Sequence, residues 1–227
     1  MLITLEKILS PETVQRFQAQ LTNAPWIDGK NTAGIQAAAI KTNLQLDDQS
    51  PLAITLASQI MDTLGLHPLF ISAALPHKVI TPKFNCYREQ GHYGLHIDNA
   101  VMTMPQRAEV MRTDLSATLF LSEPEEYDGG ELVVESQYGA QAVKLKAGDM
   151  VLYPSTSLHQ VLPVTRGERL ASFFWIQSMV RNNENRSLLF DLDQSIQTLA
   201  ATLGSNDPQV KILTGVYHNL VRLWAEL

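Results

Sequence analysis

The sequence predicts a mainly β fold of the sandwich, barrel or jelly-roll kind, with flanking helices on either side of it in the chain. Between about residues 69 and 176, short runs of strand-forming residues are separated by turns such as Asp128-Gly129-Gly130 and Gly148-Asp149. Apolar residues at helical spacing precede this region and return after about residue 182. Strands and helices do not alternate within it, which argues against a doubly wound parallel sheet.

Two helices are predicted before the β region, and each begins at a serine–proline pair. The serine caps the helix and the proline takes its first position. The first helix follows Ser10-Pro11 and ends at Asn23-Ala24-Pro25, and the second follows Ser50-Pro51 and ends at Gly65. We expect residues 26–34 to form a turn.

A series of short strands is expected next. Their ranges are residues 69–74, 82–88, 91–99, 115–121, 130–135, 141–146, 150–154, 160–164 and 169–176. Residues 99–114 interrupt this rhythm with Met102, Met104 and Met111. Because long connections at the mouth of a site often bind or cover ligands, we expect a lid or substrate-binding loop here, with an ordinary surface loop as the alternative.

The C-terminal part is predicted to be a helical hairpin. Its first helix ends at Gly204 and its second begins at Asp207-Pro208. We expect residues 182–227 to be an appendage to a domain of residues 1–181. The apolar faces of this hairpin would pack on the β core or on another subunit, so a homo-oligomer through these helices is one expectation.

Composition excludes several classes of protein. A formal net charge of −6 and the lack of any Lys/Arg run argue against nucleic acid as a partner. No apolar run is long enough to span a bilayer, and the N-terminus lacks the pattern of a signal peptide. The single cysteine, Cys86, excludes an internal disulfide and a multi-thiolate metal site. We therefore expect a cytoplasmic protein without a membrane partner.

A His-x-Asp pair, His96 and Asp98, lies in the glycine-flanked stretch Gly91–Asn99. Alternate side chains of a strand share a face, so this imidazole and carboxylate converge as two metal ligands. A third ligand has to come from another strand, and His159 fits because it lies at the start of one. Two histidines and a carboxylate suit non-haem Fe(II), since they leave one face open for a bidentate cosubstrate and O2.

An open iron site of this kind needs an electron donor. If the donor is 2-oxoglutarate, its far carboxylate requires a cation, and Arg169 lies across the turn at 165–167 on the strand after His159. Taken singly, a His-x-Asp pair is usually structural and an arginine after a turn is usually solvated. The hypothesis depends on their joint placement on predicted strands.

A longer ordered set of motifs surrounds these residues. It comprises Tyr87-x5-Tyr93-x2-His96-x-Asp98, Asp128-Gly129-Gly130-Glu131-Leu132, Ala147-Gly148-Asp149, Ser157-Leu158-His159-Gln160-Val161, the segment from Pro163 to Arg169, and Trp175. With it the chain resembles the iron(II)/2-oxoglutarate-dependent dioxygenases, and among them the bacterial PKHD-type hydroxylases, relatives of prolyl 4-hydroxylase. The resemblance covers about residues 80–180 by prolyl-hydroxylase-like motifs, and nearly the whole chain at the PKHD-type level.

The resemblance implies a double-stranded β-helix (a jelly roll) in which His96, Asp98 and His159 hold iron and Arg169 binds the 5-carboxylate of 2-oxoglutarate. It implies that the Tyr87 hydroxyl helps to bind this cosubstrate, although a purely structural core aromatic is an equal alternative. Prolyl-hydroxylase relatives commonly carry lysine where Arg169 stands, which keeps the charge but changes the geometry. L-ascorbate is implied as the compound that keeps the iron reduced.

The implied reaction is hydroxylation of a substrate by O2, with release of succinate and CO2. The substrate stays open between a peptidyl proline or lysine and a small molecule such as a siderophore. A cupin-like metal-binding β-barrel without oxidative turnover (an isomerase, sensor or structural module) is the alternative, and Arg169 argues against it. An interaction scaffold with a dead site would require a lost ligand.

Other residues near the motifs are expected to be structural. His92 would share a strand face with His96, but Gly94 permits a bulge that removes His92 from the ligand set. Tyr93 and Trp175 are expected to be pocket walls rather than reacting groups. The remaining histidines lie in turns or on a terminal helix, and are His67, His77 and His218.

Overall fold

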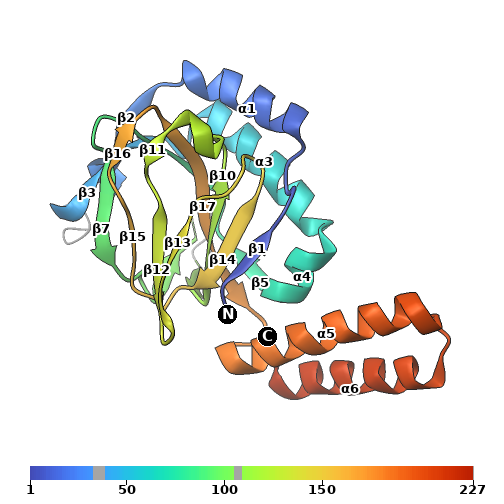
Figure 1. The fold of residues 1–227 in the computed structure, drawn as a ribbon. Helices are drawn as coiled ribbons and strands as arrows, with labels where there is room; N and C mark the ends of the chain where they lie inside the picture. Colours follow the sequence, from blue (N-terminus) through green and yellow to red (C-terminus); the bar gives the residue numbers. More distant parts are fainter. Residues whose placement is uncertain (33–38, 105–108, 227) are drawn as a thin grey trace.

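The computed structural model describes residues 1–32, 39–104 and 109–226, and two β-sheets that face each other form its centre (Figure 1). Over these residues the larger sheet runs β1 (Ile3–Leu5), β14 (Met150–Pro154), β10 (Leu115–Phe120), β17 (Arg169–Ser178), β6 (Lys83–Tyr87), β4 (Leu44–Leu46) and β2 (Trp26–Asp28), with β5 (Pro76–Val79) also paired to β17. The smaller sheet runs β13 (Gly139–Val143), β12 (Leu132–Ser136), β15 (His159–Val161), β7 (His92–His96) and β3 (Lys41–Thr42). This is the jelly-roll arrangement that the motifs implied.

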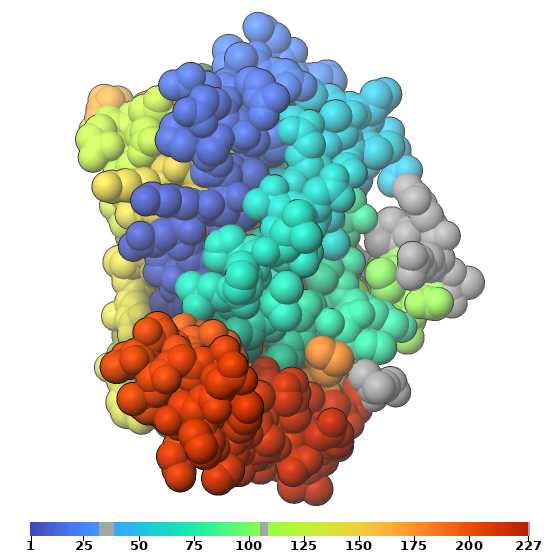
Figure 2. All heavy atoms as spheres, turned by 90° about the vertical axis from the view of Figure 1, so that its right-hand side faces the viewer, coloured from blue at the N-terminus to red at the C-terminus, as the bar shows by residue number. Residues whose placement is uncertain are grey.

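Three helices cover the outer face of the larger sheet, and are α1 (Pro11–Thr22), α3 (Pro51–Gly65) and α4 (Pro68–Ala74). Ser10 and Ser50 cap α1 and α3 as expected, since each side chain accepts a hydrogen bond from the backbone three residues later. The main apolar core lies between these helices and the sheet, and includes Phe17, Ile60 and Phe174. Figure 2 shows the three helices on one face of the molecule.

The two sheets enclose a second core at one end of the space between them. Its buried members come from both sheets and include Phe120, Leu132, Val134 and Tyr153. Apolar packing therefore fixes the two sheets relative to each other.

The segment 69–74 was expected to be a strand, and this expectation is wrong. It belongs to α4, which begins at Pro68 and is capped by His67, whose Nδ1 accepts a hydrogen bond from the backbone N–H of Phe70 at 3.2 Å. A short apolar run fits a buried helix as well as a strand, and here the cap and the proline decide.

The turn expected at residues 26–34 is only partly correct. Strand β2 occupies Trp26–Asp28, a 3-10 helix follows at Gly29–Thr32, and residues 33–34 lie outside the described part of the chain. The strands predicted from the sequence did not include β1, β3 and β4, which are two or three residues long. Most of the other expected strands are present within a few residues of their predicted ends.

The C-terminal helical hairpin is confirmed. Helix α5 (Asn183–Leu203) ends at Gly204, and α6 (Pro208–Trp224) starts after its cap Asp207. The hairpin rests on the β core and α4 through a small apolar cluster that includes Leu75, Val180 and Leu189 (Figures 1 and 2). None of the described helices combines the length and apolar character that crossing a bilayer demands.

The connection 99–114 contains two short paired strands, β8 (Val101–Thr103) and β9 (Val110–Arg112). Residues 105–108 at its tip lie outside the described chain. Met111 is buried, and Arg112 forms a two-point ion pair with Asp114 at 2.7 and 3.0 Å. This segment is therefore an anchored hairpin, and its closure as a lid stays a prediction.

Candidate metal centre

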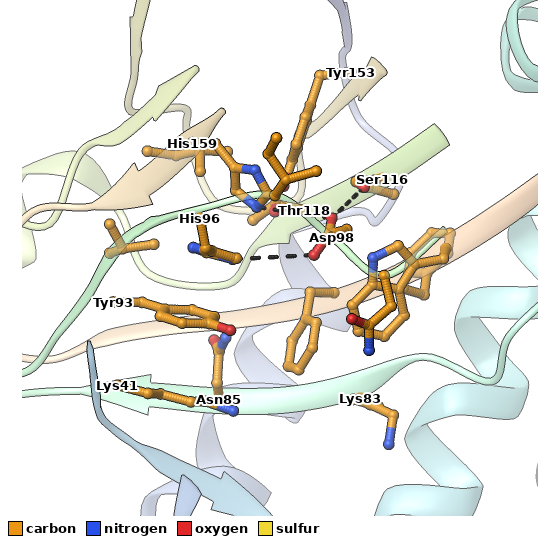
Figure 3. A pocket seen from close by; sticks show the side chains of 18 of the residues that line it. Lys41, Lys83, Asn85, Tyr93, His96, Asp98, Ser116, Thr118, Tyr153 and His159 are labelled. Atoms are coloured by element: carbon orange, nitrogen blue, oxygen red, sulfur yellow. Dashed lines mark hydrogen bonds and ion pairs between the residues drawn. The ribbon is translucent and has the colours of Figure 1, made fainter. Parts of the chain in front are cut away.

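Three potential metal ligands converge at one end of the smaller sheet (Figure 3). His96 is the last residue of β7 and lies opposite His159, the first residue of β15, in the strand pairing. Asp98 follows two residues after the end of β7. Their ligand atoms all lie within 4.8 Å of one another, with Nε2 of His96 4.0 Å and Nε2 of His159 3.7 Å from the Asp98 carboxylate.

The expected bulge in β7 is present. His159 pairs with His96 but Val161 pairs with Tyr93, so β7 contains one more residue than β15 over this interval. The bulge sets the face that His96 presents to the site. His92 does not belong to the ligand cluster, and its Nδ1 lies 2.9 Å from the carbonyl oxygen of Gln90.

Backbone contacts determine which imidazole nitrogen is available. Nδ1 of His96 lies 2.8 Å from the Gly94 carbonyl oxygen, and Nδ1 of His159 lies 3.0 Å from that of Ser157. Because a carbonyl oxygen only accepts hydrogen bonds, each Nδ1 carries the proton and each Nε2 keeps its lone pair. Both Nε2 atoms are the ones that approach Asp98.

Asp98 is oriented by a serine pair from the larger sheet. The Ser116 hydroxyl on β10 donates to Oδ2 of Asp98 at 2.6 Å (Figure 3). The Ser155 hydroxyl lies 2.8 Å from that of Ser116. This contact links the two sheets directly at the site. Sequence reasoning missed it, since a serine in a strand carries no local signal of its partner.

Aromatic rings enclose the two imidazoles. The Tyr93 ring stacks on His96 with ring centroids 3.7 Å apart, and the Tyr153 ring contacts His159 edge-on at 5.1 Å. Burial, followed by the neighbouring His159, lowers the pKa of His96 to about 4. The His96 ring is therefore neutral near neutral pH, in the state that a metal ligand requires.

Arg169 and Tyr87 lie together in the lining of the same cavity. They face each other in the pairing of β17 with β6, and both are almost fully buried. The Arg169 guanidinium carbon lies 5.4 Å from the Tyr87 ring centroid and 4.9 Å from that of Phe120. Among the described residues, Nε and Nη2 of Arg169 have no hydrogen-bond partner. A buried guanidinium with two unused donors is a ready site for a carboxylate.

The glycine pair of the Asp128-Gly129-Gly130 motif makes room for this arginine. Gly130 has a φ of +68°, and a Cβ there would lie 3.0 Å from Cδ of Arg169 and 2.8 Å from a methyl group of Val164. The backbone therefore approaches the arginine more closely than any side chain allows. Glu131, the next residue, is outside the ligand cluster.

One cavity of about 970 Å³ between the sheets is lined by the three potential ligands and by Tyr87, Tyr93, Ser116, Tyr153 and Arg169. Met102 and Asn99 border it, as expected for the loop that follows Asp98. The lining residues that sequence reasoning did not single out include Lys41, Lys83, Asn85, Thr118 and Phe173. They come from strands far apart in the chain, so only the sheet pairing brings them together.

Comparison with known proteins identifies the family. The model of the 2OG-Fe(II) oxygenase superfamily matches residues 82–177, and that of the PKHD-type hydroxylase C-terminal domain matches residues 183–226. A PKHD-type hydroxylase of Teredinibacter turnerae is 58% identical over 226 residues, which is 100% of both chains.

Solved prolyl hydroxylases share the fold. A prolyl-4-hydroxylase of Pseudomonas putida aligns with a TM-score of 0.52 at 21% identity, covering 78% of this chain and 92% of its own. A Trichoplax adhaerens prolyl hydroxylase, in complex with a hypoxia inducible factor peptide, aligns with a TM-score of 0.54 at 16% identity, covering 82% and 86%.

Proposed function

We propose that the cavity with His96, Asp98 and His159 is the active site of this chain, which belongs to the PKHD-type hydroxylases of the 2OG-Fe(II) oxygenase superfamily. The chain is accordingly an Fe(II)- and 2-oxoglutarate-dependent hydroxylase that uses O2. One observation carries the placement of the site: a cluster of three ligands and a buried arginine with unused donors line the same cavity.

The residues present fit both groups. His96, Asp98 and His159 would hold Fe(II), because two imidazole nitrogens and one carboxylate oxygen suit this ion. Arg169, with Tyr87, would hold the distal carboxylate of 2-oxoglutarate. Iron and 2-oxoglutarate, when bound, supply the oxidising chemistry, which couples hydroxylation of the substrate to release of succinate and CO2.

The chain's own residues prepare this site before any ligand arrives. The carbonyls of Gly94 and Ser157 hold each imidazole in the tautomer that exposes Nε2. Ser116 holds the Asp98 carboxylate in place. Tyr93 covers one side of His96 and limits the access of water to the cluster.

The metal assignment is tested by adding Fe(II) and 2-oxoglutarate to the protein without O2. A weak visible charge-transfer band should appear in the wild type and disappear in His96→Ala and in Asp98→Ala. The matched control is His92→Ala, which removes a neighbouring histidine of the same strand and should keep the band. A folded wild-type protein without a band would refute the assignment.

The cosubstrate assignment has its own test. Arg169→Ala should raise the 2-oxoglutarate concentration that gives half of the band by about tenfold or more, because it removes a buried charged partner. Direct Fe(II) binding should stay close to that of the wild type. Loss of iron binding in this variant would contradict the role given to Arg169.

L-ascorbate is a further part of the proposal, supported by the resemblance to prolyl hydroxylases. It should prolong turnover, measured as total succinate released, without raising the initial rate. The family match and the buried Arg169 both favour oxidative turnover over the alternative of a cupin-like metal-binding barrel without it.

The proposal extends to residues 182–227 as an appendage that forms a homo-oligomer. The match of a separate C-terminal family model supports the division, and the exposed apolar side chains of Leu203, Ile212 and Leu223 support the contact. Light scattering after size-exclusion chromatography should give a mass above that of one chain. Ile212→Asp should reduce it.

A further inference from the structure

Lys41 is a buried cation in the cavity, and the proposed reaction assigns it no role. It lies on β3, at the edge of the smaller sheet, and is 7% exposed. Lys41 lines the same cavity as the metal cluster, on the far side of the Tyr93 ring from His96 (Figure 3). Lys41 therefore faces the space that a substrate would occupy.

Within the described part of the chain, no acidic side chain forms an ion pair with Lys41. Its Nζ donates a hydrogen bond to the neutral amide oxygen of Gln45 at 3.0 Å and lies 5.5 Å from the Tyr93 ring centroid. Among the described residues no carboxylate lies within ion-pair distance of it. Segments 33–38 and 105–108 contain no Asp or Glu in the sequence. A buried charge without an opposite charge beside it is costly, which makes the position a site for an anion.

The other charges of the cavity balance one another. Lys83, the second lysine of the lining, forms an ion pair with Asp48. In the loaded site Arg169 offsets Asp98, and the two charges of Fe(II) offset those of the 2-oxoglutarate dianion. Lys41 stays uncompensated after both groups have bound, so the remaining ligand, the substrate, is the one that can neutralise it.

The surroundings of Lys41 also define the rest of that ligand. The rings of Tyr93, Phe173 and Trp175 line the cavity, and the last two pack edge to face with centroids 5.5 Å apart. A cavity of about 970 Å³ has room for a small organic molecule beside the cosubstrate. Aromatic walls next to one cation favour a molecule with an apolar part and a single anionic group.

Resting on the proposed function, we infer that the substrate is a small organic anion, with a carboxylate or an equivalent group bound by Lys41 and its apolar part held against Phe173 and Trp175. Lys41 is then a specificity-determining residue of the hydroxylation. Burial, and next the charge of Lys83, lower the pKa of Lys41 to about 8, against smaller opposing effects of Asp48 and Asp28. The amine is still protonated at neutral pH, as anion binding requires.

The test uses benzoate and its neutral analogue benzamide as probes. Each is titrated calorimetrically, without O2, into full-length protein that is loaded with Fe(II) and 2-oxoglutarate. Benzoate should bind the wild type about tenfold tighter than benzamide or better, while the charge-transfer band persists. Lys41→Met should abolish this preference, and Lys41→Arg should retain it.

Lys146→Met, which removes the same charge from the exposed surface, is the matched control and should behave as the wild type. The inference is overturned by absent benzoate binding, by equal binding of the two probes, or by a preference that survives Lys41→Met. It is also overturned if benzoate abolishes the band, since it would then displace the cosubstrate.

Titration of the band with 2-oxoglutarate separates two roles for Lys41. Lys41→Met should leave the 2-oxoglutarate requirement within about twofold of the wild type. A tenfold rise would place Lys41 in the cosubstrate site and refute its role toward the substrate. Failure of the proposed function is recognised separately, because the wild type would then show no band at all.

Discussion

Replacing Lys41 by methionine should stabilise the fold, although it removes a buried side chain. Burial lowers the pKa of Lys41 from 10.5 to about 8. Each pKa unit corresponds to about 1.4 kcal/mol, so keeping this amine charged costs the folded state about 3 kcal/mol at neutral pH. The lost hydrogen bond to Gln45 offsets about 1 kcal/mol of the gain. Lys41→Met should therefore raise the free energy of unfolding by about 2 kcal/mol.

The stability advantage of Lys41→Met should depend on pH, and it should decrease as the pH rises. The folded pKa lies below the unfolded one, so between pH 8 and 10.5 the unfolded state binds more protons and the wild type gains stability as the pH rises. Urea unfolding of both proteins at pH 7 and pH 9.5 should show the advantage of Lys41→Met shrinking at the higher pH. A variant less stable than the wild type at pH 7, or a difference independent of pH, would refute this reasoning.

Three further predictions concern the proposed metal and cosubstrate sites. Ser116→Ala should weaken Fe(II) binding by about 10- to 100-fold in a metal titration, because Asp98 loses the hydrogen bond that orients it. Without metal, the wild type should lose stability to urea as the pH falls from 6.5 toward 4, since the folded pKa of His96 lies below its unfolded value, and His96→Gln should reduce this loss. Gly130→Ala should destabilise the fold by about 1–3 kcal/mol and raise the 2-oxoglutarate requirement, because its methyl group meets Arg169, whereas an unchanged requirement would contradict that contact.

The parts of the fold that could be predicted depend on short-range signals. Serine–proline pairs mark α1 and α3 because capping is decided within one helical turn. Strand alternation predicts that His96 and Asp98 converge, and they do, although β7 ends at His96 and Asp98 lies two residues beyond it. His159 required more, since only the pairing of β15 with β7 sets it opposite His96. The place of His159 at the start of a predicted strand suggested this position, and the ordered motifs supported it.

The parts that could not be predicted depend on contacts between distant strands. Ser116 reaches Asp98 because β10 of one sheet faces the end of β7 of the other, and nothing in the sequence around Ser116 records this. Lys41 lies on a two-residue strand with no periodicity to detect. Its burial follows from pairing with Tyr93, which is 52 residues away in the chain.

The two sheets contribute different residues to the candidate site, and Lys41 lies where the chain crosses from one sheet to the other. The ligand cluster sits at the end of the smaller sheet, whereas Arg169, Tyr87 and Trp175 belong to the larger sheet, which the helices support. The chain passes from the smaller sheet to the larger one between β3 and β4, and the bond from Lys41 to Gln45 spans this crossing. Changes at the crossing should therefore alter which substrate enters while leaving iron and 2-oxoglutarate binding intact.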